Sequence, residues 1–200
     1  MLSGRRTMHT GREAKGRHSS CSPRGYTLIE VLIVVTVLGI MGAMVIPQVA
    51  SADSLRTRAA VRAVIADITY IQSDAMAFQR GRAMLFDVAT NTTLGLEVNG
   101  PVLDIENDVL FEPTRASGRL ELNLADATFG LSRLGSVNID GGNVLIFDEM
   151  GAPVTTPQGN APSTGGMIVI DGPVDSYWLR IDGFTGHVTS GRVDPNDPAG

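Results

Sequence analysis

The chain has 200 residues, 43% of them hydrophobic and 18% charged, which allows one domain with appendages and excludes a disordered polymer. Residues 1–24 carry six basic side chains and one acid, whereas the chain from residue 26 onward carries 10 basic and 20 acidic ones. An acidic body disfavours nucleic acid as a partner, because binding it requires basic side chains that neutralise phosphates. A single cysteine, Cys21, excludes an intramolecular disulfide.

The first predicted element is an apolar segment over residues 26–46, in which Glu30 is the only charged side chain. As a helix it would span roughly 31 Å, about the thickness of a bilayer's hydrocarbon core. The basic residues before it predict a single-pass segment with a cytoplasmic N-terminus and an exported, acidic C-terminal part.

Two general interpretations of this N-terminus each leave something unexplained. A secretory signal peptide, cleaved near Ala50-Ser51-Ala52, fits the basic flank, but the apolar segment is longer than the usual ~7–15 residues. A plain transmembrane anchor explains the length, but not Glu30 or the abrupt start of the segment at Gly25.

A third interpretation comes from residues 25–30, GYTLIE, which closely resemble the recognition site of type IV prepilins: a basic leader ending in glycine, then an aromatic residue and a glutamate. The resemblance implies that prepilin peptidase removes a leader of residues 1–25 by cutting between Gly25 and Tyr26. It also implies N-methylation of the new Tyr26 amine. The family's commonest residue after the cut is phenylalanine, so Tyr26 is a departure expected to affect the efficiency of cleavage.

The same resemblance suggests why a carboxylate lies in an apolar segment. A charge inside a membrane is costly and usually marks a function or a partner. Cleavage would create a positive amine at Tyr26, which in a staggered helical assembly can pair with a neighbouring subunit's Glu30. The amine of the same chain competes, because residues four apart share a helix face. We therefore interpret Glu30 as an assembly residue.

One long helix is predicted over residues 26–80. Pro47 should kink it, since proline removes a backbone donor, and pilin-like proteins usually have a proline at this place. Gly81 ends the helical pattern. The second half carries an apolar stripe that should pack on the following domain, formed by Val61, Val64, Ile65, Ile68, Ile71, Ala75 and Phe78.

Residues 81–200 predict an exported, mostly antiparallel β domain. Turn residues separate short strand-like segments at 83–88, 93–98, 119–124, 143–147, 166–171, 177–182 and 186–190. The last two are joined by DGFTG, a good hairpin signal. Residues 152–165 are expected to form an exposed loop and residues 193–200 a frayed tail.

The body also resembles one branch of the pilin-like proteins, the GspH/FimT pseudopilins. The resemblance rests on Gln72-Ser73-Asp74-Ala75 followed by Arg80-Gly81, and on the spacing of the segments after Phe147; residues 100–138 match no part of the branch. It implies an α+β, pilin-like fold: a long N-terminal helix, membrane-spanning in its first half, packed on a C-terminal antiparallel β domain.

The implied function is that of a minor pseudopilin in a type II secretion system, at the tip or initiation complex of a periplasmic pseudopilus. Its partners would be other pseudopilins, prepilin peptidase and the cytoplasmic (inner) membrane, with the C-terminal domain in the periplasm. The alternative is a minor type IV pilin in pilus assembly, adhesion or DNA uptake. Gene neighbourhood would separate the two.

A membrane-anchored enzyme is the least favoured class. Without the leader the chain keeps one histidine, His187, and no cysteine, which defeats Cys/His catalysis and a cysteine-containing zinc cluster. Asp148 and Glu149 are adjacent, so in a strand they would point to opposite faces. The oxygen-rich turns at 140–143 and 194–197 lack EF-hand spacing, which favours ordinary turns over weak calcium sites. We expect no catalytic residue, metal site or cofactor.

The late aromatic residues are expected to pack rather than to form a ligand platform. Tyr177 and Trp178 should lie on opposite faces of a strand, leaving one of them exposed as a weak candidate for a partner contact. Phe184 should pack within the predicted hairpin.

Overall fold

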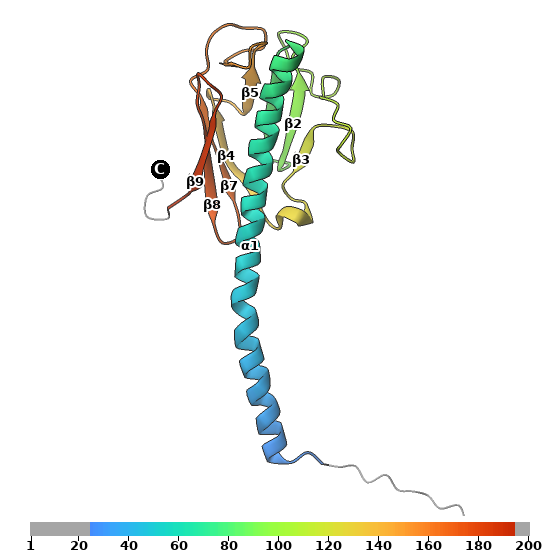
Figure 1. Cartoon of the computed structure of the whole chain (residues 1–200), viewed down its shortest axis with the longest axis vertical. Coiled ribbons are helices and arrows are strands. Elements are labelled where there is room, and N and C mark those ends of the chain that lie inside the picture. Colours follow the sequence, from blue (N-terminus) through green and yellow to red (C-terminus); the bar gives the residue numbers. More distant parts are fainter. Residues whose placement is uncertain (1–24, 195–200) are drawn as a thin grey trace, which may run out of the picture. The chain divides into compact units, whose positions relative to one another are not determined.

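The computed structural model describes the backbone of residues 25–194, with side chains described for residues 25–42 and 52–194. The chain forms two compact units that divide between Gly42 and Ala43. A single helix, α1 (Leu28–Phe78), contributes to both units, and the strands follow it in the second (Figure 1). Its bounds are close to the predicted 26–80.

The second unit contains two antiparallel sheets, which confirms the predicted α+β class. The first sheet has the order β3-β2-β1-β5-β6, with β1 (Arg82–Asp87), β2 (Thr92–Glu97), β3 (Glu121–Asn123), β5 (Val144–Phe147) and β6 (Pro153–Val154). The second has the order β4-β7-β8-β9, with β4 (Arg133–Ile139), β7 (Gly166–Asp171), β8 (Ser176–Ile181) and β9 (Val188–Arg192). A short 3-10 helix, η1 (Ala127–Phe129), precedes β4.

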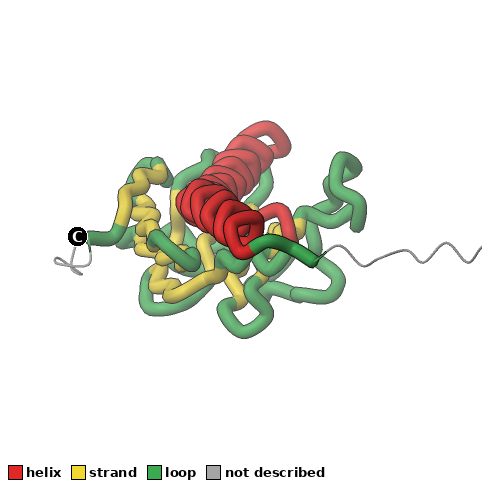
Figure 2. The backbone as a smooth tube through the Cα atoms, turned by 90° about the horizontal axis from the view of Figure 1, so that it is seen from below, coloured by secondary structure: helices red, strands yellow, loops and turns green. Residues whose placement is uncertain are grey.

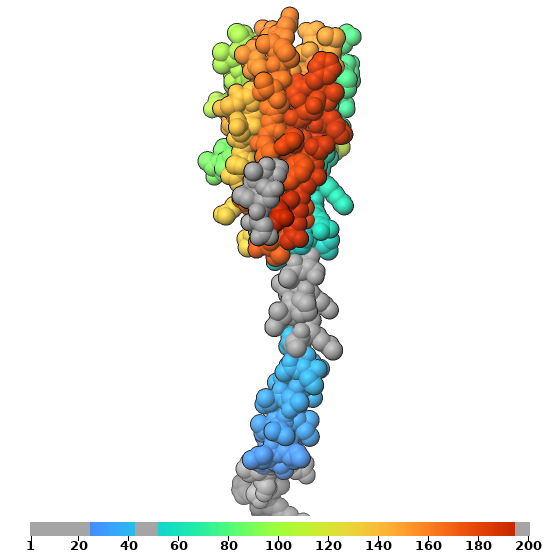
Figure 3. Space-filling view, turned by 90° about the vertical axis from the view of Figure 1, so that its left-hand side faces the viewer, coloured from blue at the N-terminus to red at the C-terminus, as the bar shows by residue number. Residues whose placement is uncertain are grey.

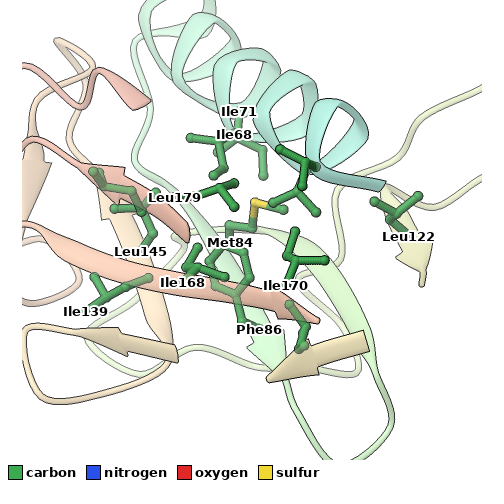
Figure 4. Close-up of a cluster of buried hydrophobic side chains, with 14 of the residues drawn as sticks. Ile68, Ile71, Met84, Phe86, Leu122, Ile139, Leu145, Ile168, Ile170 and Leu179 are labelled. Atoms are coloured by element: carbon green, nitrogen blue, oxygen red, sulfur yellow. The ribbon is translucent and has the colours of Figure 1, made fainter. Parts of the chain in front are cut away.

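The helix and both sheets share one hydrophobic core. Figure 2 shows the backbone from below, with the helix in red and the strands in yellow. Figure 4 shows Ile68 and Ile71 of α1 above Met84 of β1 and Leu179 of β8. Figure 3 shows one face of the β domain, and residues of β7, β8 and β9 (orange to red) form much of it. The buried residues of α1 are Ala60, Val61, Val64, Ile68, Ile71 and Ala75.

The predicted apolar stripe is therefore confirmed in its centre and wrong at its end. Ile65 is only partly buried, and Phe78 is 65% exposed because α1 ends there. Gln79 takes a left-handed conformation (φ 50°), and the Arg80 N–H donates to the Ala75 carbonyl at 3.2 Å. This is the pattern of a Schellman cap, so the helix ends at Phe78, three residues before Gly81.

The strand predictions agree with the structure where alternation was clear. Residues 166–171 are β7 as predicted, and the β8–β9 hairpin closes with the Gly186 N–H donating to the Asp182 carbonyl at 2.9 Å. Residues 125–142, for which no strand was predicted, contain β4. The Gly, Ser and Asn residues of this strand weaken its hydrophobic alternation.

The prediction of an exposed loop over residues 152–165 is wrong in part. Pro153 and Val154 form β6 and are buried. Gly165 is also buried, at φ +87°, and a Cβ there would lie 2.4 Å from the Ile181 carbonyl oxygen, so only glycine fits. The composition indicated a loop because it could not show that the sheets would close over this segment.

Two polar side chains of α1 connect it to the β domain at its C-terminal end. The Gln72 amide donates to the carbonyls of Gly151 and Thr185, each at 2.8 Å, and so holds two loops against the helix. Asp74 accepts a hydrogen bond from Arg82 at the start of β1. These contacts give Gln72 and Asp74 a structural reason for their place at the helix end.

A third connection holds the long excursion between β2 and β3 against α1. Arg115 donates to Asp67, which is 5% exposed and whose Oδ2 has no hydrogen-bond partner among the described residues. Burial raises the pKa of Asp67, and Arg115 opposes that rise. A hydrogen bond to Glu112 raises the pKa of Tyr70 to about 12. The sequence placed Asp67 off the buried stripe of α1. In the structure Asp67 is buried nonetheless, and Arg115 donates a hydrogen bond to it.

We expect Arg115→Ala to destabilise the fold by about 1–3 kcal/mol. Breaking a fully buried ion pair costs about 3–5 kcal/mol, and the partial exposure of the Arg115 side chain, 31%, lowers that figure. Urea unfolding of the detergent-solubilised chain, followed by Trp178 fluorescence, measures the change. Arg119→Ala, at an exposed position four residues away, is the matched control. An equal effect of the two changes would show that the ion pair contributes nothing.

Candidate functional site

The candidate site is the segment at the beginning of α1. Gly25, Tyr26 and Thr27 precede the helix, and Thr27 is its N-cap. The Glu30 N–H donates to Thr27 Oγ1 at 3.3 Å, and the Val31 N–H donates to the Thr27 carbonyl at 3.2 Å. Thr27 and Glu30 have the spacing of a capping box, and a carboxylate in the first turn is favoured by the helix dipole.

This cap is a functional feature that the sequence interpretation missed, although the T-x-x-E spacing contained the signal. The hydrogen bond uses the backbone N–H of Glu30 and not its carboxylate, so the assembly role of Glu30 stays a prediction. Because Thr27 fixes where the helix begins, the Gly25–Tyr26 bond lies in non-helical backbone, two residues before the first helical position.

Within the first unit, the predicted cleavage site is open. Tyr26 is 82% exposed, and a Cβ at Gly25 would meet no atom within 4 Å. Glu30 is exposed as well. Among residues 25–42, no side chain packs over Gly25 or Tyr26, which leaves this side of the bond accessible to a protease.

The first part of α1 is apolar around its whole circumference. Its exposed hydrophobic residues within the first unit are Leu28, Ile29, Val31, Leu32, Ile33, Val34, Val35, Val37, Leu38, Ile40 and Met41. Soluble proteins rarely leave a contiguous apolar surface of this kind in water, which makes it a candidate surface for contact with lipid or with other subunits.

Among the described residues, no helix meets the length and hydropathy of a membrane span.

Pro47 lies within α1, in the stretch 43–51 whose side chains are outside the described residues. The kink expected at Pro47 therefore stays a prediction.

Asp148 and Asp140, which the sequence offered as candidates for catalysis or calcium binding, accept hydrogen bonds from nearby turns and loops. Asp148 Oδ1 accepts hydrogen bonds from the N–H groups of Met150 and Ala152 at 2.9 and 2.8 Å, while Glu149 is exposed. Burial disfavours the charged form of Asp140, but hydrogen bonds from Ser163 and Thr164 outweigh it and lower the Asp140 pKa. Among the residues that the structure describes, no group of His, Cys, Asp and Glu could hold a metal ion.

The late histidine and aromatic residues lie where the hairpin places them. His187 is exposed, and its backbone N–H donates to Thr185 Oγ1 at 3.2 Å. Tyr177 is buried in the core and Trp178, the next residue of the strand, is half-buried, so neither of them is exposed as the alternation suggested. The prediction that Phe184 packs in the hairpin is wrong: it sits in the connecting turn and is 83% exposed.

The comparisons with known proteins agree with the N-terminal motif. The prokaryotic N-terminal methylation motif matches residues 22–46, which covers Gly25, Tyr26 and Glu30 and confirms the prepilin-like character of this segment. Among solved structures, the chain is similar to the minor pseudopilin EpsH from the Type 2 Secretion System of Vibrio cholerae. The two are 11% identical, with a TM-score of 0.42 over 71% of this chain and 94% of that chain. No curated protein matches.

Thr27→Val should loosen the beginning of α1 without changing the size of the side chain. The substitution removes the hydroxyl that accepts the Glu30 N–H, and loss of an N-cap costs ~1 kcal/mol of helix stability. Hydrogen exchange in detergent micelles should show about fivefold faster exchange at the amide of residue 30. Thr36→Val, inside the same helix, is the control. Unchanged exchange at residue 30 would contradict the N-cap assignment.

Proposed function

We propose that the chain is a structural subunit of a pilin-like filament, made as a precursor, cut between Gly25 and Tyr26 and anchored in the cytoplasmic membrane through the first part of α1. The observation that carries the proposal is the methylation motif at residues 22–46, which includes the first part of a helix whose apolar residues occupy every side. A protein that needs its membrane segment only as an anchor has no use for a motif of this kind.

The proposed assembly uses α1 twice. The first part is surrounded by lipid before assembly and by the apolar helices of neighbouring subunits after it. Small residues such as Gly39 and Gly42 allow these helices to approach one another closely. Its second part carries the β domain on the buried stripe centred on Ile68 and is not free to pack elsewhere. Glu30 pairs with the amine of Tyr26 in a neighbour, so that neither charge is stranded.

Within this class we propose a minor pseudopilin of a type II secretion system, acting in the tip or initiation complex of a periplasmic pseudopilus. The choice rests on the resemblance of Gln72-Ser73-Asp74-Ala75 and Arg80-Gly81 to GspH/FimT subunits. A surrounding operon with a secretion ATPase, a secretin and further pseudopilins would support this assignment. A retraction motor among the neighbouring genes would instead favour the minor type IV pilin.

Processing supplies the first test of the proposal. We expect the membrane-extracted protein to begin at Tyr26, with a methylated amine, and to lack residues 1–25. Intact-mass measurement decides this, and co-expression with and without prepilin peptidase is the control. A mature chain that begins at Asp53 would establish the signal-peptide interpretation instead.

Glu30→Gln should preserve insertion, cleavage and folding of the β domain but weaken incorporation beside other subunits at least tenfold. The change keeps the shape and the hydrogen-bonding capacity of the side chain and removes only its charge. A tenfold loss requires only about 1.4 kcal/mol, less than the cost of stranding one member of a buried pair. Crosslinking to partner subunits measures the effect.

Thr36→Val is again a suitable control, since it changes a polar side chain of the same helix without touching its charge. The Thr36 hydroxyl donates to the Leu32 carbonyl within the helix, 2.7 Å away, and is not needed for pairing. Assembly of Glu30→Gln at the level of this control would mean that the charge has no part in subunit contact.

A further inference from the structure

The loop that follows β2 contains an Asn-Gly pair. Asn99 and Gly100 are the only place in the sequence where a glycine follows an asparagine. Asparagine is one of the chemically labile residues, because its side-chain amide can be lost. Glycine has no Cβ to shield its backbone nitrogen, so this nitrogen can approach the side chain of the preceding residue. The pair is therefore where the backbone of this chain is best able to attack a side-chain amide.

The structure leaves both reacting groups accessible. Asn99 is exposed, and the pair lies in irregular backbone between β2 and β3. The neighbouring Val98 N–H donates to the Gly81 carbonyl at 3.0 Å, whereas the Gly100 N–H donates to no group in the described part of the chain. Asn99 also lines a cavity of about 580 Å³, through which water reaches its side chain. The attacking nitrogen is thus unpaired, and the water needed for hydrolysis is at hand.

The other asparagines lack this combination. Each of them is followed by a residue with a side chain. Asn107 is exposed, but the N–H that follows it, that of Asp108, donates to the Asp104 carbonyl at 2.9 Å. Asn160 is exposed as well, but Ala161 follows it. Asn107 and Asn160 therefore serve as internal controls for the reactivity of Asn99.

The side chain of Asn99 also helps to close the loop. Its Nδ2 donates to Asp108 Oδ1 at 2.8 Å, and Asp108 Oδ2 accepts the Asp104 N–H at 3.2 Å. Asp108 is itself attached to β2, because its carbonyl accepts the Glu97 N–H at 2.7 Å. The amide of Asn99 is thus one of the contacts that hold residues 99–108 together, and a carboxylate in its place has no hydrogen to donate.

We propose that Asn99–Gly100 is a self-modification site, at which loss of the side-chain amide releases the loop of residues 99–108. The Gly100 nitrogen forms a bond to Asn99 Cγ, the bond from Cγ to Nδ2 breaks, and ammonia leaves with the proton from the Gly100 nitrogen. Water then opens the cyclic imide. Cleavage of its bond to Cγ gives aspartate, and cleavage of its bond to the main-chain carbonyl carbon gives isoaspartate. Water is the only co-reactant, and ammonia the only other product.

Both products place a carboxylate where the amide donated to Asp108. Two carboxylates at hydrogen-bonding distance repel each other. Residues 99–108 already carry three acids and no base, so the loop itself offers no compensating charge. Arg80 lines the same cavity as Asn99 and offers the new carboxylate a partner away from Asp108. Isoaspartate also lengthens the main chain by one carbon, and neither step depends on the proposed function.

The first test follows the reaction itself. The detergent-solubilised full chain is kept at neutral pH in water enriched in heavy oxygen, then digested in ordinary water for peptide mass spectrometry. We expect residue 99 to gain heavy oxygen and to yield both aspartate and isoaspartate, while Asn107 and Asn160 remain amides. Aspartate without isoaspartate would overturn the imide route, and conversion no faster than at Asn160 would overturn the site.

Two variants test the role of the pair. In Gly100→Ala the added Cβ would meet only the Val102 carbonyl oxygen, 3.9 Å away, so the fold has room for it. This variant should convert roughly tenfold more slowly or less, because the methyl group shields the attacking nitrogen. Asn99→Gln keeps the amide, lengthens the side chain by one carbon and should also remain unmodified. Conversion of Gly100→Ala at the unchanged rate would contradict attack by this nitrogen.

The last test concerns release of the loop. Asn99→Asp reproduces the charge of the product, and hydrogen exchange at residues 104 and 108 reports on the loop, since both amides donate within it. We expect several-fold faster exchange there than in the unsubstituted chain. Asn160→Asp, the same charge change on the same cavity, is the matched control and should leave this exchange unchanged. Equal exchange in the two variants would show that the modification does not release the loop.

Discussion

The structure depends on the burial of one face of α1 beneath two antiparallel sheets. Val64, Ile68 and Ile71 have no exposed surface, and they belong to one hydrophobic core together with residues from strands of both sheets. Neither sheet alone would enclose this stripe, and a sheet of four or five strands with an uncovered apolar face is not stable in water. The helix therefore organises the β domain, rather than being attached to it.

That burial divides the helix into parts with different requirements. From Ala60 to Ala75 the apolar residues occupy one face, and polar residues such as Gln72 and Asp67 bind loops on its flanks. From Leu28 to Met41 the apolar residues surround the helix, so no single sheet could cover them. A chain with both patterns in one helix holds its domain with one part and leaves the other for lipid or for other subunits.

Charge follows the same division. The carboxylate of Glu30 lies in the first turn of α1, where the helix dipole favours a negative charge before any partner is present. Its pairing with a neighbour's amine remains the proposal made above.

The sequence alone determined the features that depend on neighbours along the chain: the prepilin-like motif, the helical stripe centred on Ile68, the β7 strand and the hairpin turn before Gly186. It did not reveal β4, the buried segment around Pro153, or the burial of Asp67, because each depends on residues far away in sequence. The local sequence pattern indicates that Asp67 faces solvent. Its partner Arg115 is 48 residues further along the chain, so the local pattern could not indicate their contact. Phe184 was expected to pack within the hairpin, but in the structure it lies in the turn between β8 and β9 and is exposed. Local pattern fixes the period of an element, whereas only tertiary contact decides which polar groups are paired and which apolar ones are left uncovered.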